Sequence, residues 1–205
     1  QHNHPPHQNS VTHYYHRQSQ LQHYNLPIHW RQCNSNGVKP HLSIGGAGLS
    51  DEIAAVAANS AYRAKFVAQI VSFVAGKHTK NSVPIAGLDV DWEFPTGVAQ
   101  KQNHLALIKE LRVALNNQSA SDGNTYELAI AVGGTTPNMP ANLAVYHTDY
   151  FDQDVIDHVD YIYIMNYDMG SSGYPNSHHA PYQGCVDAFT YFTTILGYPP
   201  SKLLM

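Results

Sequence analysis

The sequence predicts an α/β fold in which short parallel strands alternate with helices, and two observations carry this prediction. Apolar stretches of strand length alternate with segments whose apolar residues recur at helical spacing, in the order β-α-β-α-β-α-β-α. Each predicted strand also ends in glycine or polar residues, where a barrel of parallel strands carries its functional loops. We therefore expect the helices to be the crossover connections between parallel strands.

The predicted strands are short apolar segments bounded by turn residues. They cover Pro40 to Ile44, Val83 to Phe94, Tyr126 to Val132 and Asp160 to Tyr167. The helices that follow them have apolar stripes. They cover Asp51 to about Gly76, Gln100 to Asn116, a short segment within Tyr150 to His158, and Cys185 to Leu196. Four strands are fewer than the eight that a closed barrel requires.

Residues 1–37 differ from the rest of the chain. The part up to Asn36 contains seven of the fourteen histidines and little apolar periodicity, which predicts an irregular arm. A loose metal-binding tract of imidazoles is the functional alternative. We favour a solvated polar tail, because no cysteine or carboxylate cluster completes a site.

Composition describes a globular protein and argues against several classes of function. The 205 residues are 43% hydrophobic and 13% charged, with a formal net charge of −4. The scattered basic residues do not suggest a nucleic-acid partner, and no apolar run is long enough to span a membrane. The first residues have no apolar segment typical of a signal peptide. Cys33 and Cys185 leave open either one disulfide or two free thiols.

The densest chemical signal is the segment GLDVDWEFP, residues 87–95. In an extended strand, Asp89, Asp91 and Glu93 point to one face about 7 Å apart, while the apolar residues between them face a helical layer. Carboxylates held together in this way titrate as a coupled set, which raises the pKa of at least one. A raised pKa suits a general acid. A Mg²⁺ or Ca²⁺ site is the alternative that the spacing leaves open.

GLDVDWEFP resembles the DGxDxDxE signature of glycoside hydrolase family 18, the chitinases and their relatives. Three other parts of the chain are similar to this family in the right order: SIGG at 43–46 resembles SxGG, LAIAV at 128–132 lies where the next strand falls, and MNYD at 165–168 resembles MxYD. Residues 196–205 are similar to the lead into the seventh strand. The resemblance implies an incomplete (β/α)8 TIM barrel over residues 38–205, with strands 3 to 6 and the start of strand 7 readable.

The resemblance also implies retaining hydrolysis of the β-1,4-linked N-acetylglucosamine of chitin or its oligosaccharides, with the substrate's own acetamido oxygen as nucleophile. Glu93 would protonate the glycosidic oxygen and then act as base on water. Asp91 would hold the acetamido N–H and share a proton with Asp89, and Tyr167 would donate its hydroxyl to the acetamido oxygen. No cofactor and no metal are implied. A polymer substrate suggests secretion into the extracellular space.

Further contacts with the sugar are expected from residues around this constellation, namely Asp168, Met165, Trp92, Ser43, Gly45 and Gly46. For Met165 we favour core packing, and the two glycines serve mainly to turn the backbone. Ala86 stands where the signature has its first Asp, which would weaken the tuning of the carboxylates without removing the proton donor.

Other functions remain open. A chitin-binding lectin that has lost catalysis is one alternative, although the presence of Glu93 counts against it. A truncated product without function is another, because family barrels have two strands before SxGG and two after MxYD. Enzymes acting on N-glycan cores share the motif, so the substrate within the family is not fixed by these residues.

Overall fold

A computed structural model describes residues 26–77, 83–134, 153–168 and 178–205, and within them one five-stranded sheet in the order β1-β2-β3-β4-β5. All neighbouring strands are parallel. The strands are β1 (His41–Gly45), β2 (Gly87–Asp91), β3 (Glu127–Gly133), β4 (Tyr161–Met165) and β5 (Leu203–Leu204). Strands that pair in sequence order, each reached through a helix, are the arrangement of an α/β barrel, which agrees with the predicted fold class.

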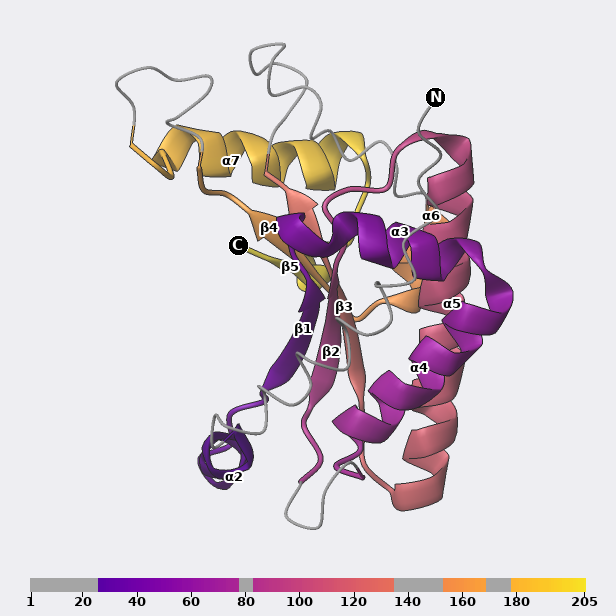
Figure 1. The fold of residues 1–205 in the computed structure, drawn as a ribbon. Coiled ribbons are helices and arrows are strands. Elements are labelled where there is room, and N and C mark those ends of the chain that lie inside the picture. Colours follow the sequence, from indigo (N-terminus) through magenta and orange to yellow (C-terminus); the bar gives the residue numbers. More distant parts are fainter. Residues whose placement is uncertain (1–25, 78–82, 135–152, 169–177) are drawn as a thin grey trace, which may run out of the picture.

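Helices α3, α4 and α5 lie together along one face of the sheet (Figure 1). The described helices are α2 (Leu26–Ser35), α3 (Ser50–Ala58), α4 (Ser60–Val74), α5 (Gly97–Asp122), α6 (Gln153–His158) and α7 (Tyr182–Thr190). Short turns of other helix types cover Ala47–Leu49, Tyr191–Ile195 and Pro200–Lys202. None of the helices in the described ranges combines the length and the apolar character needed to cross a membrane.

The prediction of one continuous helix from Asp51 to Gly76 is wrong at Asn59. The backbone of Asn59 is extended, and its Oδ1 accepts hydrogen bonds from the backbone N–H groups of Ala61 and Tyr62. An Asn in this position caps a new helix, because it satisfies N–H groups that have no partner within the first turn. The chain therefore turns between α3 and α4, and both helices pack against α5.

The core lies between the sheet and the helices. Leu88 and Val90 of β2 are fully buried on the helix side, where they meet the buried stripe of α5 formed by Leu107, Ile108, Leu111 and Leu115. Burying each such side chain contributes about 1.5–3 kcal/mol relative to leaving it exposed. Because Leu88 and Val90 pack against the helices, the alternating residues Asp89 and Asp91 must lie on the opposite face of the sheet.

The expectation of an irregular N-terminal arm is wrong for Leu26–Ser35, which form helix α2. Trp30 of this helix is only 8% exposed and meets Phe73 of α4 edge to face, with ring centroids 5.7 Å apart. One buried aromatic residue is enough to anchor a polar helix that has little apolar periodicity. Residues 1–25 lie outside the described residues, and the domain boundary after residue 37 stays a prediction.

The two cysteines and the last strand resolve two further questions. Cys33 and Cys185 are both free and half-buried, which selects the free thiols over the disulfide. Leu203 and Leu204 pair with β4 in parallel, so the start of a seventh barrel strand that the resemblance implied is present.

Candidate active site

The three predicted carboxylates lie where β2 ends, on the face of the sheet opposite the core helices. Asp89 is in the strand and only 7% exposed, Asp91 is its half-buried last residue, and Glu93 follows just beyond it. In the sheet register Ser43 pairs with Asp89, and Gly45 with Asp91. The alternation of the strand therefore puts Asp89 and Asp91 on one face, as the sequence predicts. The predicted strand to Phe94 is too long, because β2 ends at Asp91 and Glu93 follows in a bend.

A hydrogen bond from the neighbouring strand β1 holds the side chain of Asp89 in place. Ser43 Oγ on β1 donates a hydrogen bond of 2.7 Å to Asp89 Oδ2. The Oδ1 atoms of Asp89 and Asp91 are buried and accept no hydrogen bond from any residue that the structure describes. Buried carboxylate oxygens in this condition disfavour the ionised form.

Burial raises the pKa of Asp89 to about 6, aided by the charge of Asp91 and opposed by the Ser43 hydrogen bond and by His41. Burial also raises the pKa of Asp91. Two adjacent carboxyls that both resist ionisation hold one proton between them more readily than none. The prediction of a raised pKa within the row is confirmed.

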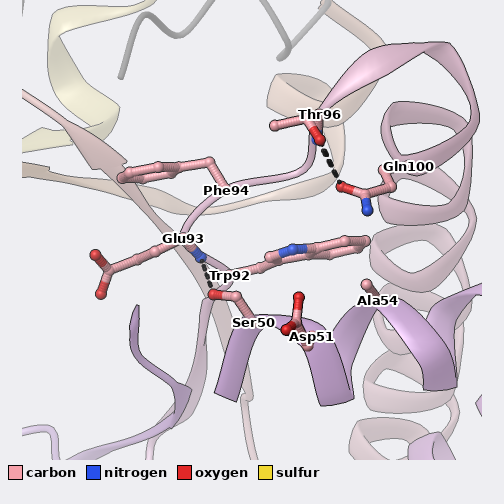
Figure 2. Close-up of a pocket in the computed structure, with 8 residues that line it drawn as sticks. All are labelled: Ser50, Asp51, Ala54, Trp92, Glu93, Phe94, Thr96 and Gln100. Carbon is pink, nitrogen blue, oxygen red and sulfur yellow. Dashed lines mark hydrogen bonds between the residues drawn. The ribbon is translucent and has the colours of Figure 1, made fainter. Parts of the chain in front are cut away.

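Glu93 is fixed by the turn that follows β1. Its backbone N–H donates to Ser50 Oγ at 3.0 Å, and Ser50 is the first residue of α3 (Figure 2). Burial, then the charge of Asp91, raises the pKa of Glu93, and a hydrogen bond from the backbone of Ala47 opposes this. Both the main chain and the carboxyl of Glu93 are thus positioned by residues 47–50.

A pocket of about 300 Å³ lies behind the end of β2, between the first turns of α3 and α5 (Figure 2). Its lining residues are Ser50, Asp51, Ala54, Trp92, Glu93, Phe94, Thr96 and Gln100. The carboxyl group of Glu93 points away from the other side chains of this pocket. The pocket therefore lies behind the end of β2, and the carboxyl group of Glu93 lies outside it.

Trp92 lies on the helix side of the sheet. It is 2% exposed, and its ring meets His104 of α5 at a centroid distance of 5.6 Å. The strand alternation directs it away from the carboxylates on either side of it in sequence. This geometry gives Trp92 a packing role against α5, and its expected contact with the sugar stays a prediction.

Gly45 and Gly46 bring the end of β1 against the end of β2. Gly46 N–H donates to the Asp91 carbonyl oxygen at 2.8 Å. Gly45 has φ of 124°, and a Cβ added there would collide with that same carbonyl oxygen. Both glycines are required by backbone geometry, and their proximity to Asp91 places them at the edge of the site.

The MNYD segment follows β4, whose last residue is the half-buried Met165. Tyr167 is 51% exposed, and its ring stacks on His179 with centroids 6.0 Å apart. Burial, then the negative charges of Asp91 and Glu93, raises the pKa of Tyr167. The carboxylate row thus acts electrostatically on Tyr167, and the role expected for its hydroxyl stays a prediction.

Asp168 is exposed and adopts a left-handed backbone, with φ of 59°. Its Oδ1 lies 3.2 Å from His179 Nδ1, and its backbone N lies 3.3 Å from the same atom. The start of the MNYD segment is also held from the end of β3: Gly134, which follows β3, donates its N–H to the Met165 carbonyl oxygen at 3.2 Å. Asp168 thus stands beside Tyr167 at the carboxyl end of the sheet.

Sequence reasoning missed several supporting residues. It placed neither Ser50 nor His179 among the site residues, although both contact predicted site residues. It also passed over His41 and Glu127, which share the inner face with Ser43 and Ala129 by strand alternation. That alternation is the signal that could have found the last two.

The fold and the site together define a class: an α/β-barrel protein with a row of carboxylates and a tyrosine at the carboxyl ends of its strands. Residues 4–205 match the family model described as glycosyl hydrolases family 18, and the chain belongs to this family.

Relatives agree with this assignment. A probable endochitinase of Caenorhabditis elegans is 30% identical over 133 residues, covering 64% of this chain and 20% of that protein. The structure of chitinase ChiW from Paenibacillus matches with a TM-score of 0.67 and 28% identity, covering 87% of this chain and 21% of that chain. A chitinase-like agglutinin from Robinia pseudoacacia matches with a TM-score of 0.62 and 29% identity, covering 81% and 49% respectively. These likenesses confirm the predicted barrel class, although the chain spans only a part of each relative.

Proposed function

We propose that this chain carries the catalytic strand and site of a hydrolase that cleaves β-1,4-linked N-acetylglucosamine in chitin or its oligosaccharides. The observation that carries the proposal is the row Asp89–Asp91–Glu93, which is buried enough to raise the pKa of all three carboxyls and whose charge contributes to raising the pKa of Tyr167. Membership of family 18 and the name of the C. elegans relative support it. Action outside the cell is part of this proposal, since the substrate is a polymer.

Glu93 acts as the general acid. Its raised pKa keeps a proton available at a higher pH than an ordinary glutamate allows. It gives this proton to the glycosidic oxygen as the bond to the anomeric carbon breaks. In the second half of the reaction the resulting carboxylate takes a proton from the incoming water.

The substrate's acetamido oxygen acts as the nucleophile and forms a positively charged oxazolinium ring. Asp91 accepts the acetamido N–H and stabilises this charge, and its buried Oδ1 has the free acceptor capacity for that bond. Asp89 shares a proton with Asp91, and Ser43 keeps Asp89 in place. Tyr167 donates its hydroxyl to the acetamido oxygen and orients it for attack, and Asp168 contacts the sugar hydroxyls.

A lectin without catalysis is the second candidate, and the likeness to the Robinia agglutinin favours it. The two candidates differ in turnover and not in binding. In the hydrolase, Glu93→Gln abolishes cleavage and preserves binding of the oligosaccharide.

The test is release of a fluorophore from a chitotriose glycoside by the purified chain, beside Glu93→Gln and a matched control, Glu52→Gln. Glu52 is exposed on α3, so the same chemical change there removes no group of the site. We expect turnover by the wild type and by Glu52→Gln, with a loss of at least about 10³-fold in Glu93→Gln. Oligosaccharide binding without turnover in all three would support the lectin and contradict the hydrolase.

A further inference from the structure

The hydroxyl group of Ser50 joins the ends of the two strands that carry the site. Its Oγ accepts the hydrogen bond of 3.0 Å from the Glu93 backbone N–H (Figure 2). The same Oγ donates a longer hydrogen bond, 3.4 Å, to the carbonyl oxygen of Gly46. A serine hydroxyl has a single hydrogen to donate, and Ser50 gives it to the residue that follows β1 while accepting from the residue beyond β2.

Gly46 completes a closed path of hydrogen bonds back to β2. Its backbone N–H donates to the Asp91 carbonyl oxygen at 2.8 Å, and its own carbonyl oxygen accepts from Ser50. Asp91 and Glu93 are therefore both tied to Gly46, Asp91 directly and Glu93 through Ser50. The path spans the single residue between them, Trp92, which is buried. The main chain from Asp91 to Glu93 is thus fixed at both ends by the connection between β1 and α3.

Glu93 depends on this path because the sheet does not extend to it. The register of β1 and β2 ends at the pair Gly45 and Asp91, and β2 pairs with β3 only as far as Val90. Glu93 follows in a bend. Its backbone N–H bonds to the side chain of Ser50, where a residue inside a strand would bond to the backbone of its neighbour.

A helix-capping role does not account for the hydroxyl of Ser50. Serine at the start of a helix commonly satisfies N–H groups of that helix. The N-cap of α3 is Leu49, which makes no side-chain bond to the helix. Both bonds that the structure gives to Ser50 Oγ reach residues outside α3. The cap of α4 differs, since Asn59 accepts from N–H groups of its own helix.

We propose that Ser50 is a positioning residue for the general acid: by joining the Glu93 main chain to Gly46, it sets the position of the Glu93 carboxyl relative to Asp91. The catalytic consequence rests on the function proposed above. The connection between β1 and α3 also reaches the carboxyl itself, through a backbone hydrogen bond from Ala47. A general acid must lie within hydrogen-bond reach of the oxygen that it protonates, and a displacement of about 1 Å can cost roughly 10²-fold in rate.

The catalytic test compares Ser50→Ala with Ser50→Thr, which keeps the hydroxyl, on the chitotriose glycoside. Ser60→Ala is the matched control, because Ser60 is the exposed first residue of α4. In Ser50→Ala we expect kcat to fall about 10- to 100-fold and KM to stay within about twofold, since a displaced acid slows proton transfer without weakening binding. Ser50→Thr and Ser60→Ala should keep kcat within about threefold of the wild type.

A merely structural role for Ser50 would lower the melting temperature of Ser50→Ala and leave the kcat of the folded protein unchanged. A kcat within about twofold of the wild type in Ser50→Ala would therefore overturn the proposal. An equal loss of kcat in Ser50→Ala and Ser50→Thr would also overturn it, because the hydroxyl would then not be the group that matters.

Amide hydrogen exchange, followed by NMR, tests the bond without turnover. The Glu93 amide of the wild type should be protected, and in Ser50→Ala it should exchange about tenfold faster or more while the Val90 amide inside β2 is unchanged. An unprotected Glu93 amide in the wild type would overturn the proposal even if Ser50→Ala did not fold. Because exchange needs no substrate, a failure of the hydrolase proposal remains distinguishable from a failure of the bond between Ser50 and Glu93.

Discussion

Ser43 Oγ donates a 2.7 Å hydrogen bond to Asp89 Oδ2, and the two residues are direct partners in the register of β1 and β2. The bond joins the SIGG segment to the carboxylate row and opposes the effect of burial on the pKa of Asp89 more than any other contact does. Hydrogen bonds to charged groups contribute about 1.5–3 kcal/mol. The conformation and the charge of Asp89 therefore depend on the neighbouring strand.

Ser43→Ala should raise the pKa of Asp89 further, because the hydrogen bond that favours its ionised form is lost. We expect kcat/KM to fall by about tenfold and the acid limb of its pH profile to move to higher pH. A pH-rate series on both proteins checks this. Ser121→Ala, at an exposed position of α5, is the matched control. An unmoved acid limb would show that the bond does not tune Asp89.

Asp89→Asn should stabilise the fold at neutral pH while abolishing activity. Burial raises the pKa of Asp89 in the folded protein to about 6, above its ordinary value of 3.8, so the folded state binds the extra proton between these values. Wild-type stability therefore falls as pH rises from about 4 to 6, by up to about 3 kcal/mol. Urea denaturation at pH 4 and pH 7.5 measures the effect. The free energy of unfolding of Asp89→Asn should exceed that of the wild type only at pH 7.5. An equal difference between the two proteins at pH 4 and pH 7.5 would contradict the raised pKa of Asp89.

Trp92→Phe separates packing from sugar binding. Because the indole is buried against His104, the smaller ring should cost about 1–3 kcal/mol of unfolding free energy and leave KM for an oligosaccharide unchanged. Denaturation and steady-state kinetics on the same preparation measure both quantities. A KM raised several-fold at unchanged stability would instead support the sugar contact expected for Trp92.

Gly45→Ala should destabilise the end of β1 by about 2 kcal/mol or more, because its Cβ would meet the Asp91 backbone and its φ is positive. Gly48→Ala is the matched control, since a Cβ at Gly48 would meet no atom within 4 Å. Thermal denaturation measures the melting temperatures of both variants, and Gly45→Ala should melt at the lower temperature. Similar melting temperatures for the two would mean that β1 does not approach Asp91 this closely.

Local alternation predicted the strands and the shared face of the carboxylates, because both depend on residues two apart. It also placed Trp92 on the apolar face, which is where the structure has it, and only the resemblance suggested a sugar contact. The helix break at Asn59 was missed because apolar spacing continues across it, although an Asn-Ser pair is a capping signal.

Other features depend on contacts between distant parts of the chain. Helix α2 is held by Trp30 against Phe73, and its own sequence has no strong helical stripe. The bond between His41 and Tyr163 joins residues 122 positions apart, so it appears only when the register of four strands is known. No local pattern contains that information.

We propose that Glu93 and the substrate's own acetamido group cleave the glycosidic bond with retention of configuration. The most direct measurement is proton NMR of chitohexaose during cleavage by the chain, which resolves the anomer formed first. We expect the β-anomer to appear first and to convert slowly to the α-anomer, with no cleavage by Glu93→Gln. Initial release of the α-anomer, or equal cleavage by Glu93→Gln, would contradict it.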